Sequence, residues 1–213
     1  MSGTHRRLVP NGLFSSYYAD TQADVIFDTN RAWCTRLPLL STLWPESRVM
    51  ACVRDVGAIM NSVEHLVRQN VLQPSSIFHY QSGGTVYTRV NGLAGPEGLV
   101  GYAYDALKEA FYGADADRLL LVQYETLTTN PEKALAAVYD FLGEPSYAHD
   151  CAHVAYDATA FDTKAGTPGL HTVRPEVKAL PRPLILPPDL VHRFARDAFW
   201  KDAANNPRGV TVV

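Results

Sequence analysis

An arginine and a serine eight residues apart are the side chains of this sequence best suited to binding an anion. Arg54 directly follows the apolar run 49–53, and Ser62 lies about two turns into the helical segment that comes next. A buried parallel strand reads as a continuous apolar run, and open α/β sheets bind ligands at the carboxyl ends of their strands. The planar, permanently charged guanidinium suits a phosphate, and the serine adds a neutral donor. The alternative is a structural arginine paired with Asp55 and a solvated helix serine.

A second group of residues with anion-binding chemistry lies in the last third of the chain. Gly166 and Gly169 allow a backbone to approach an anion closely. Lys164, His171 and Arg174 add positive charge to the same short segment. The segment is either an anion-binding loop or an ordinary surface loop.

Two histidines at i and i+4 are the only spacing that points to a metal. On a helix, His149 and His153 would share a face and could hold zinc, with Cys151 between them. No third and fourth ligand is evident in the sequence, so we predict no metal site.

The elements that must position these residues alternate between strands and helices. Continuous apolar runs, helical periodicity and capping residues define the elements. Strands are predicted over 24–28, 48–53 and 119–124, helices over 31–44, 56–70, 96–112, 131–142 and 188–200, and a short extended piece over 85–90. Residues 144–187 are rich in Pro, Gly and His and are expected to be irregular.

This alternation predicts an α/β fold: a single domain in which a mostly parallel central sheet is flanked by helices. A chain of 213 residues is long enough for one such domain with a real core. We divide it into an N-terminal remnant (1–23), an α/β core (24–143) and a C-terminal cap with a final helix (144–213).

Composition excludes several classes of protein. Hydrophobic residues make up 46% and charged residues 19% of the chain, which is typical of a globular protein and not of a disordered one. A net charge of -3 argues against a nucleic-acid-binding surface, and no apolar run reaches the roughly 18 residues of a membrane span. We interpret Cys34 and Cys52 as core residues, and with Cys151 the count is odd, so we expect a reducing, cytoplasmic compartment.

Three motifs, in this order along the chain, resemble the sulfotransferases that use 3′-phosphoadenosine 5′-phosphosulfate (PAPS). They are residues 27–31 (FDTNR), the unit formed by a strand, Arg54-Asp55 and a helix with Ser62, and residues 121–127 (LVQYETL) followed by Asn130-Pro131 and by 139–143 (YDFLG). The sequences of residues 27–33 and 161–174 are most similar to a bacterial branch of that family.

The resemblance implies a sulfotransferase fold related to the P-loop nucleotide-binding proteins, with no metal. It implies that Arg54 and Ser62 grip the 3′-phosphate of PAPS or of adenosine 3′,5′-bisphosphate. Tyr124 would offer its ring or hydroxyl to adenine, although it could equally be a packing aromatic. Lys164, Gly166 and Gly169 would belong to a basic loop that closes over the nucleotide.

The implied reaction moves a sulfuryl group to a hydroxyl or amine of a small-molecule, glycan or peptide acceptor. Positioning and electrostatics carry most of the catalysis in such transfers. Thr29 and Asn30 stand where family members place a basic residue, so Asp28 becomes the candidate base and Arg31 the candidate contact to the transferred sulfate. Asp28 could instead be a capping acid.

The chain departs from the family in one respect, since we find no glycine-rich phosphate loop between an early strand and helix. We therefore expect the first strand and helix of the fold to be absent. A missing strand predicts an exposed sheet edge and self-association, such as a homodimer. The alternative function is a non-catalytic nucleotide-binding or partner-binding module on the same fold.

Overall fold

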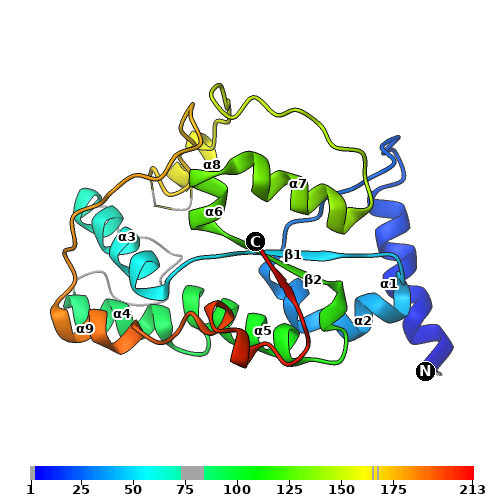
Figure 1. The fold of residues 1–213 in the computed structure, drawn as a ribbon, viewed down its shortest axis with the longest axis horizontal. Coiled ribbons are helices and arrows are strands. Elements are labelled where there is room, and N and C mark those ends of the chain that lie inside the picture. Colours follow the sequence, from blue (N-terminus) through cyan, green and yellow to red (C-terminus); the bar gives the residue numbers. More distant parts are fainter. Residues whose placement is uncertain (1–2, 73–83, 165, 167) are drawn as a thin grey trace.

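The computed structural model describes residues 3–72, 84–164, 166 and 168–213, with side chains from residue 9 onward. Within these residues, the sheet has three parallel strands, β1 (Val49–Val53), β2 (Leu119–Gln123) and β3 (Thr211–Val212), in the order β1-β2-β3 (Figure 1). The last residue extends the β2–β3 pairing, because the Val213 N–H donates to the Leu121 carbonyl at 2.9 Å. The predicted single α/β domain with a parallel sheet is confirmed.

Helices cover both faces of the sheet and extend beyond its carboxyl end (Figure 1). The helices α6 and α7 lie on one face, α2 and α5 lie on the other, and α3, α4 and α9 lie past the strand ends. Their bounds are α1 Gly3–Tyr17, α2 Leu37–Leu43, α3 Val56–Gln69, α4 Val86–Ala94, α5 Leu99–Tyr112, α6 Tyr124–Thr129, α7 Pro131–Leu142, α8 Thr159–Lys164 and α9 Pro188–Phe194. Short 3-10 helices occur at η1 Arg31–Arg36, η3 Ala116–Arg118, η4 Phe199–Lys201 and η5 Ala203–Asn205.

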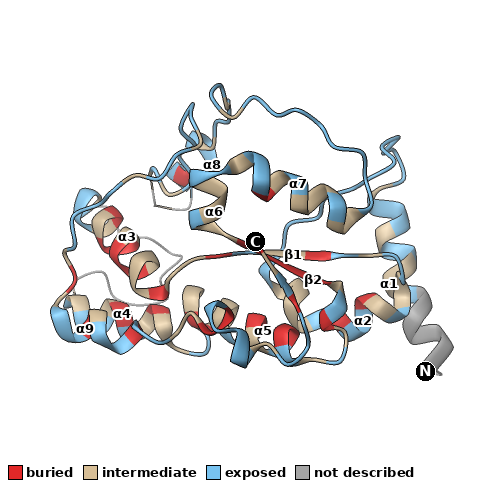
Figure 2. Ribbon diagram, viewed as in Figure 1, coloured by how far each residue is buried: buried red, intermediate tan, exposed pale blue. Residues whose placement is uncertain are grey.

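The alternation of side chains along β2 divides the core into two layers. Leu119 and Leu121 pack into a cluster with Phe111 of α5, and Leu120 packs against Ala134 of α7. All five of these side chains are buried (Figure 2). The continuous apolar run of β2 is therefore explained by burial on both faces of the strand.

Capping residues set the helix ends where the sequence predicts them. Asn130 accepts a hydrogen bond from the Lys133 N–H at 3.1 Å, with Pro131 in the first turn of α7. Gly143 ends α7 with a φ of 74°, in the left-handed region that glycine adopts most readily. Asp55 caps the N-terminus of α3 as Asn130 caps that of α7, since its carboxylate accepts from the Ala58 N–H at 2.8 Å.

The predicted strand over 24–28 is wrong. These residues form no strand, and Phe27 is 64% exposed. Val25 and Phe27 instead line a cavity of about 350 Å³ beside Leu135 and Val138 of α7. An alternating apolar pattern becomes a strand only where a neighbouring strand completes its hydrogen bonds, and no described strand pairs with this segment.

Other predicted elements need correction as well. The expected extended piece over 85–90 belongs to α4, whose N-cap Thr85 accepts from the Thr88 N–H and whose Val90 and Leu93 are buried at helical spacing. The final helix ends at Phe194 and not at residue 200, and the short β3 is not predicted. Cys52 is exposed and is not a core residue, on a β1 strand whose outer edge pairs with no described strand. No described helix combines the length and apolar character needed to span a bilayer.

A buried carboxylate joins α3 to α4. The Glu64 side chain is 3% exposed and accepts from Arg89 Nη2 at 2.6 Å, Arg89 Nε at 2.9 Å and Arg68 Nε at 3.1 Å. Burial by itself raises the pKa of Glu64, but the hydrogen bonds from Arg89 and Arg68 outweigh it and hold that pKa below its ordinary value.

We expect Glu64→Gln to lower the free energy of unfolding at pH 7 by about 2 kcal/mol, because hydrogen bonds to a charged group are replaced by bonds to a neutral one. The folded-state pKa is depressed, so the stability from the charge is present above the ordinary pKa and is lost as the pH falls through the folded value. Urea unfolding at pH 7 and at acid pH should show the difference between wild type and variant shrinking on acidification. Glu97→Gln, at an exposed position, is the control; an equal effect of both changes at pH 7 would contradict a role for the buried pair.

Candidate functional site

The register of the sheet brings Arg54 and Tyr124 together. Val53 of β1 pairs with Gln123 of β2, so the next residue of each strand leaves the same edge of the sheet. The Arg54 Cζ lies 3.9 Å from the centroid of the Tyr124 ring, a cation–π contact. Both residues are partly buried, and the ring fixes the guanidinium at the carboxyl edge, where this fold class binds its ligands.

Arg54 is not held by the acid that follows it in sequence. The Asp55 carboxylate caps α3, and no ion pair joins Arg54 to a carboxylate of the described residues. The Arg54 Nε is buried and makes no hydrogen bond to the described part of the chain. A buried donor of a charged group without a partner is costly, so this arginine is suited to an anionic ligand rather than to a structural ion pair.

Ser62 contacts a basic residue that sequence reasoning did not find. The Arg182 Nη1 donates to the Ser62 Oγ at 3.1 Å across 120 residues of chain. Arg182 lies in a proline-rich segment without periodicity, so no sequence signal connects it to α3. No hydrogen bond joins Arg54 directly to Ser62 in the described residues.

The glycine-containing loop docks at the C-terminal end of α3, the helix that carries Ser62. Gly166 and Gly169 have φ values of 69° and 87°, so both positions use the conformational freedom of glycine. The Asn70 Nδ2 donates to the Pro168 carbonyl at 3.2 Å. Asn70 is the C-cap of α3 and lies about two turns beyond Ser62 along the helix. Lys164 ends α8 and is exposed.

A buried aspartate closes this loop. Asp162, which is 2% exposed, accepts from the His171 N–H at 2.9 Å and makes a 2.6 Å contact with the His171 Nδ1. Burial raises the pKa of Asp162, but the hydrogen bonds from His171 lower it further and leave it below the ordinary value. We call this pair of residues the loop clasp.

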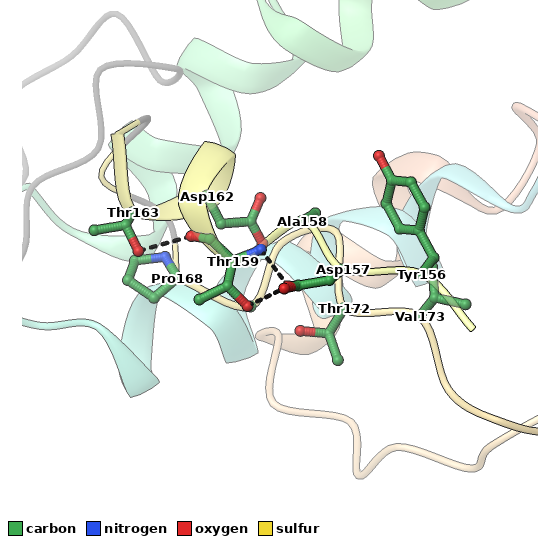
Figure 3. Close-up of a pocket in the computed structure, with 10 residues that line it drawn as sticks. Tyr156, Asp157, Ala158, Thr159, Asp162, Thr163, Pro168, Thr172 and Val173 are labelled. Carbon is green, nitrogen blue, oxygen red and sulfur yellow. Dashed lines mark hydrogen bonds between the residues drawn. The ribbon is translucent and has the colours of Figure 1, made fainter. Parts of the chain in front are cut away.

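Beside the loop clasp lies a small polar cavity of about 110 Å³ (Figure 3). Asp157 and Asp162 supply carboxylates to it, and Thr159 donates to Asp157 from both its N–H and its Oγ1. None of the described residues that line the cavity carries a basic side chain. Two carboxylates without a cation repel an anion, so this cavity does not suit a phosphate.

The two predicted catalytic residues serve other contacts. The Asp28 carboxylate accepts from the Trp33 Nε1 at 2.7 Å and from the Tyr18 hydroxyl, and the hydrogen bond to Asp28 raises the pKa of Tyr18 to about 12. Arg31 reaches the Leu99 carbonyl at 3.4 Å. Neither residue contacts the Arg54–Tyr124 pair through a hydrogen bond between described residues, and their catalytic roles stay predictions.

Residues 144–158 contain no helix, so His149 and His153 do not share a helix face. His149 contacts the Tyr139 hydroxyl at 2.8 Å, and His153 pairs with Asp150 at 2.8 Å. Within the described ranges, no group of three or more His, Cys, Asp or Glu side chains could hold a metal ion.

We expect Asp162→Asn to release the loop, because it removes the charge that receives two hydrogen bonds from His171. Hydrogen exchange of the His171 amide, followed by mass spectrometry, should be at least tenfold faster in the variant. Asp157→Asn, which changes a carboxylate of the same cavity outside the loop clasp, should leave this exchange unchanged. Equal exchange in wild type and Asp162→Asn would show that the loop is held by other contacts.

Comparison with known proteins assigns the chain to a family. The model of the sulfotransferase family matches residues 5–149, which is more than half of the chain and includes Arg54, Ser62 and Tyr124. The loop with Gly166 and Gly169 and the segment with Arg182 lie outside the match. No curated protein and no solved structure gives a significant match. On the strength of the family match, the chain belongs to the sulfotransferase family.

Proposed function

We propose that this protein binds PAPS and its product adenosine 3′,5′-bisphosphate at the carboxyl edge of the sheet, with the 3′-phosphate between Arg54 and Ser62. The observation that carries the proposal is the Arg54 guanidinium, which is fixed on the Tyr124 ring and has a buried donor without a described partner. A phosphate would satisfy that donor with a charge-assisted hydrogen bond.

The residues of the chain have distinct tasks in this proposal. Arg54 supplies charge, and Tyr124 orients the guanidinium while leaving adenine a place beside the ring. The Ser62 hydroxyl donates a hydrogen bond to the 3′-phosphate. A donor that lacks the 3′-phosphate leaves these groups unpaired, so the site rejects it. PAPS itself supplies the sulfuryl group, and we propose that the acceptor is a hydroxyl or amine of a small molecule, glycan or peptide.

The glycine loop is proposed to cover the nucleotide. The docking of Pro168 on Asn70, at the C-terminal end of the helix that bears Ser62, supports this role. The Gly166 and Gly169 backbones allow a close approach to the ligand, and Lys164 adds charge. Asp28 and Arg31 are retained as the candidate base and sulfate contact, although the bonds of Asp28 to Tyr18 and Trp33 also fit a purely orienting role.

Calorimetric titration with adenosine 3′,5′-bisphosphate and with 5′-AMP tests the site. Wild type should bind the bisphosphate more tightly than 5′-AMP by at least tenfold, because only the bisphosphate reaches Arg54 and Ser62. Arg54→Ala should weaken the binding of the bisphosphate by about 100-fold, as expected for the loss of a charge-assisted hydrogen bond. It should change the affinity for 5′-AMP little. Arg196→Ala removes an exposed arginine outside the site and is the matched control.

Two results of this titration would count against the proposal. Equal affinity of the folded wild-type protein for both nucleotides would contradict the presence of a 3′-phosphate site. An unchanged bisphosphate affinity in Arg54→Ala would place that phosphate elsewhere.

Binding without transfer is the second candidate function. In the described residues, the junctions β1–α3 and β2–α6 contain no glycine, so neither provides the glycine-rich turn that commonly wraps a phosphate. A transfer assay with radiolabelled PAPS and a panel of phenol, sugar and peptide acceptors separates the two functions. Selective bisphosphate binding with no labelled product would favour the non-catalytic module, and labelled product that disappears in Arg54→Ala would favour the enzyme.

A further inference from the structure

We propose that Arg182 determines the specificity of the nucleotide site, as a second cation for the 3′-phosphate. The inference rests on the proposed function and adds to it a residue outside the region matched by the family model. The Arg182 Nη1 lies 3.1 Å from the Ser62 Oγ, so its guanidinium stands directly beside the hydroxyl assigned to the phosphate.

A short segment holds Arg182 in this place. Residues 182–186, here called the strap, run along α3 and are pinned to it by backbone contacts. The buried Asn61 binds the strap twice: its Nδ2 donates to the Pro183 carbonyl at 3.0 Å, and its Oδ1 accepts from the Ile185 N–H at 2.9 Å. His65 Nε2 contacts the same Pro183 carbonyl at 2.8 Å.

Apolar burial completes the attachment of the strap. Leu186 is 5% exposed and packs with Met60 of α3 and Leu190 of α9. A segment that is anchored by two hydrogen bonds to a side-chain amide and by a buried leucine has a fixed register on the helix. The position of Arg182 beside Ser62 is therefore set by contacts on its C-terminal side and does not depend on Arg182 itself.

The charge of Arg182 is not neutralised inside the described chain. Its one described hydrogen bond goes to a neutral hydroxyl, and no described carboxylate lies within ion-pair distance. Arginine has five N–H donors, so four remain for a ligand or solvent. The position is exposed, and an anion can reach it.

The contact also prepares Ser62 to donate. A hydroxyl has one proton and two lone pairs. Because the Ser62 oxygen accepts from a cation, its proton is free to point at a phosphate oxygen, and the neighbouring positive charge strengthens that donation. Ser62 and Arg182 would thus act on the 3′-phosphate as one unit, together with Arg54.

The test compares both nucleotides on Arg182→Ala, Arg182→Lys and the control Arg196→Ala. Arg182→Ala should weaken the binding of adenosine 3′,5′-bisphosphate by about 10- to 100-fold and change the affinity for 5′-AMP by less than about twofold. Arg182→Lys should recover part of the affinity, since charge returns without the planar fork. A residue that only supports the fold would weaken both nucleotides equally, and that result would overturn the inference.

A second variant separates the charge from its placement. Asn61→Ala releases the strap but keeps the arginine, and it should reduce the selectivity for the bisphosphate in the same direction as Arg182→Ala. Circular dichroism checks that the variant is folded; Asn61→Asp, which keeps the acceptor for Ile185, replaces it if folding fails. Unchanged selectivity in Arg182→Ala, together with loss in Arg54→Ala, would overturn this inference while the proposed function stands. Lack of selectivity in wild type would overturn both.

Discussion

The parallel pairing of β1 with β2 is the constraint on which the site depends. It places the residues that follow the two strands at one level of the sheet, which is why Arg54 meets Tyr124 without any connecting loop. Leu120 and Leu121 are 0% exposed and face opposite layers of the core, so a slip by one residue would exchange their environments and separate the pair. Burial of the strand thus fixes the position of the charged residue beyond it.

The helix α3 is the second support, because its faces carry different tasks. Its apolar face, with Met60, packs against α9 and α4, and Glu64 holds α4 through Arg89. Its polar face carries Asn61 and Ser62 toward the strap. A tilt or rotation of α3 would therefore move the serine, the strap and the core together, so the site geometry is tied to the stability of the core.

The loop and the strap reach the site from late in the chain, and polar contacts supply much of their attachment. The loop is closed by the Asp162–His171 clasp, and the strap is held by Asn61. Segments with few buried apolar contacts open at a lower free energy than core elements. This property suits the proposed role of the loop as a cover for the nucleotide, whereas Arg54 and Tyr124 stand on the rigid sheet edge.

The sequence alone determined the elements that have local signals. Arg54 at the end of β1, the Asn130 cap and the Gly143 terminus of α7 follow from apolar runs and capping chemistry. Tertiary structure decided what depends on distant partners. The segment 24–28 has a strand pattern but no neighbouring strand, and Arg182 is separated from Ser62 by 120 residues. Pattern reasoning sees spacing along the chain, while a strand partner or a contact across the fold exists only after the chain has packed.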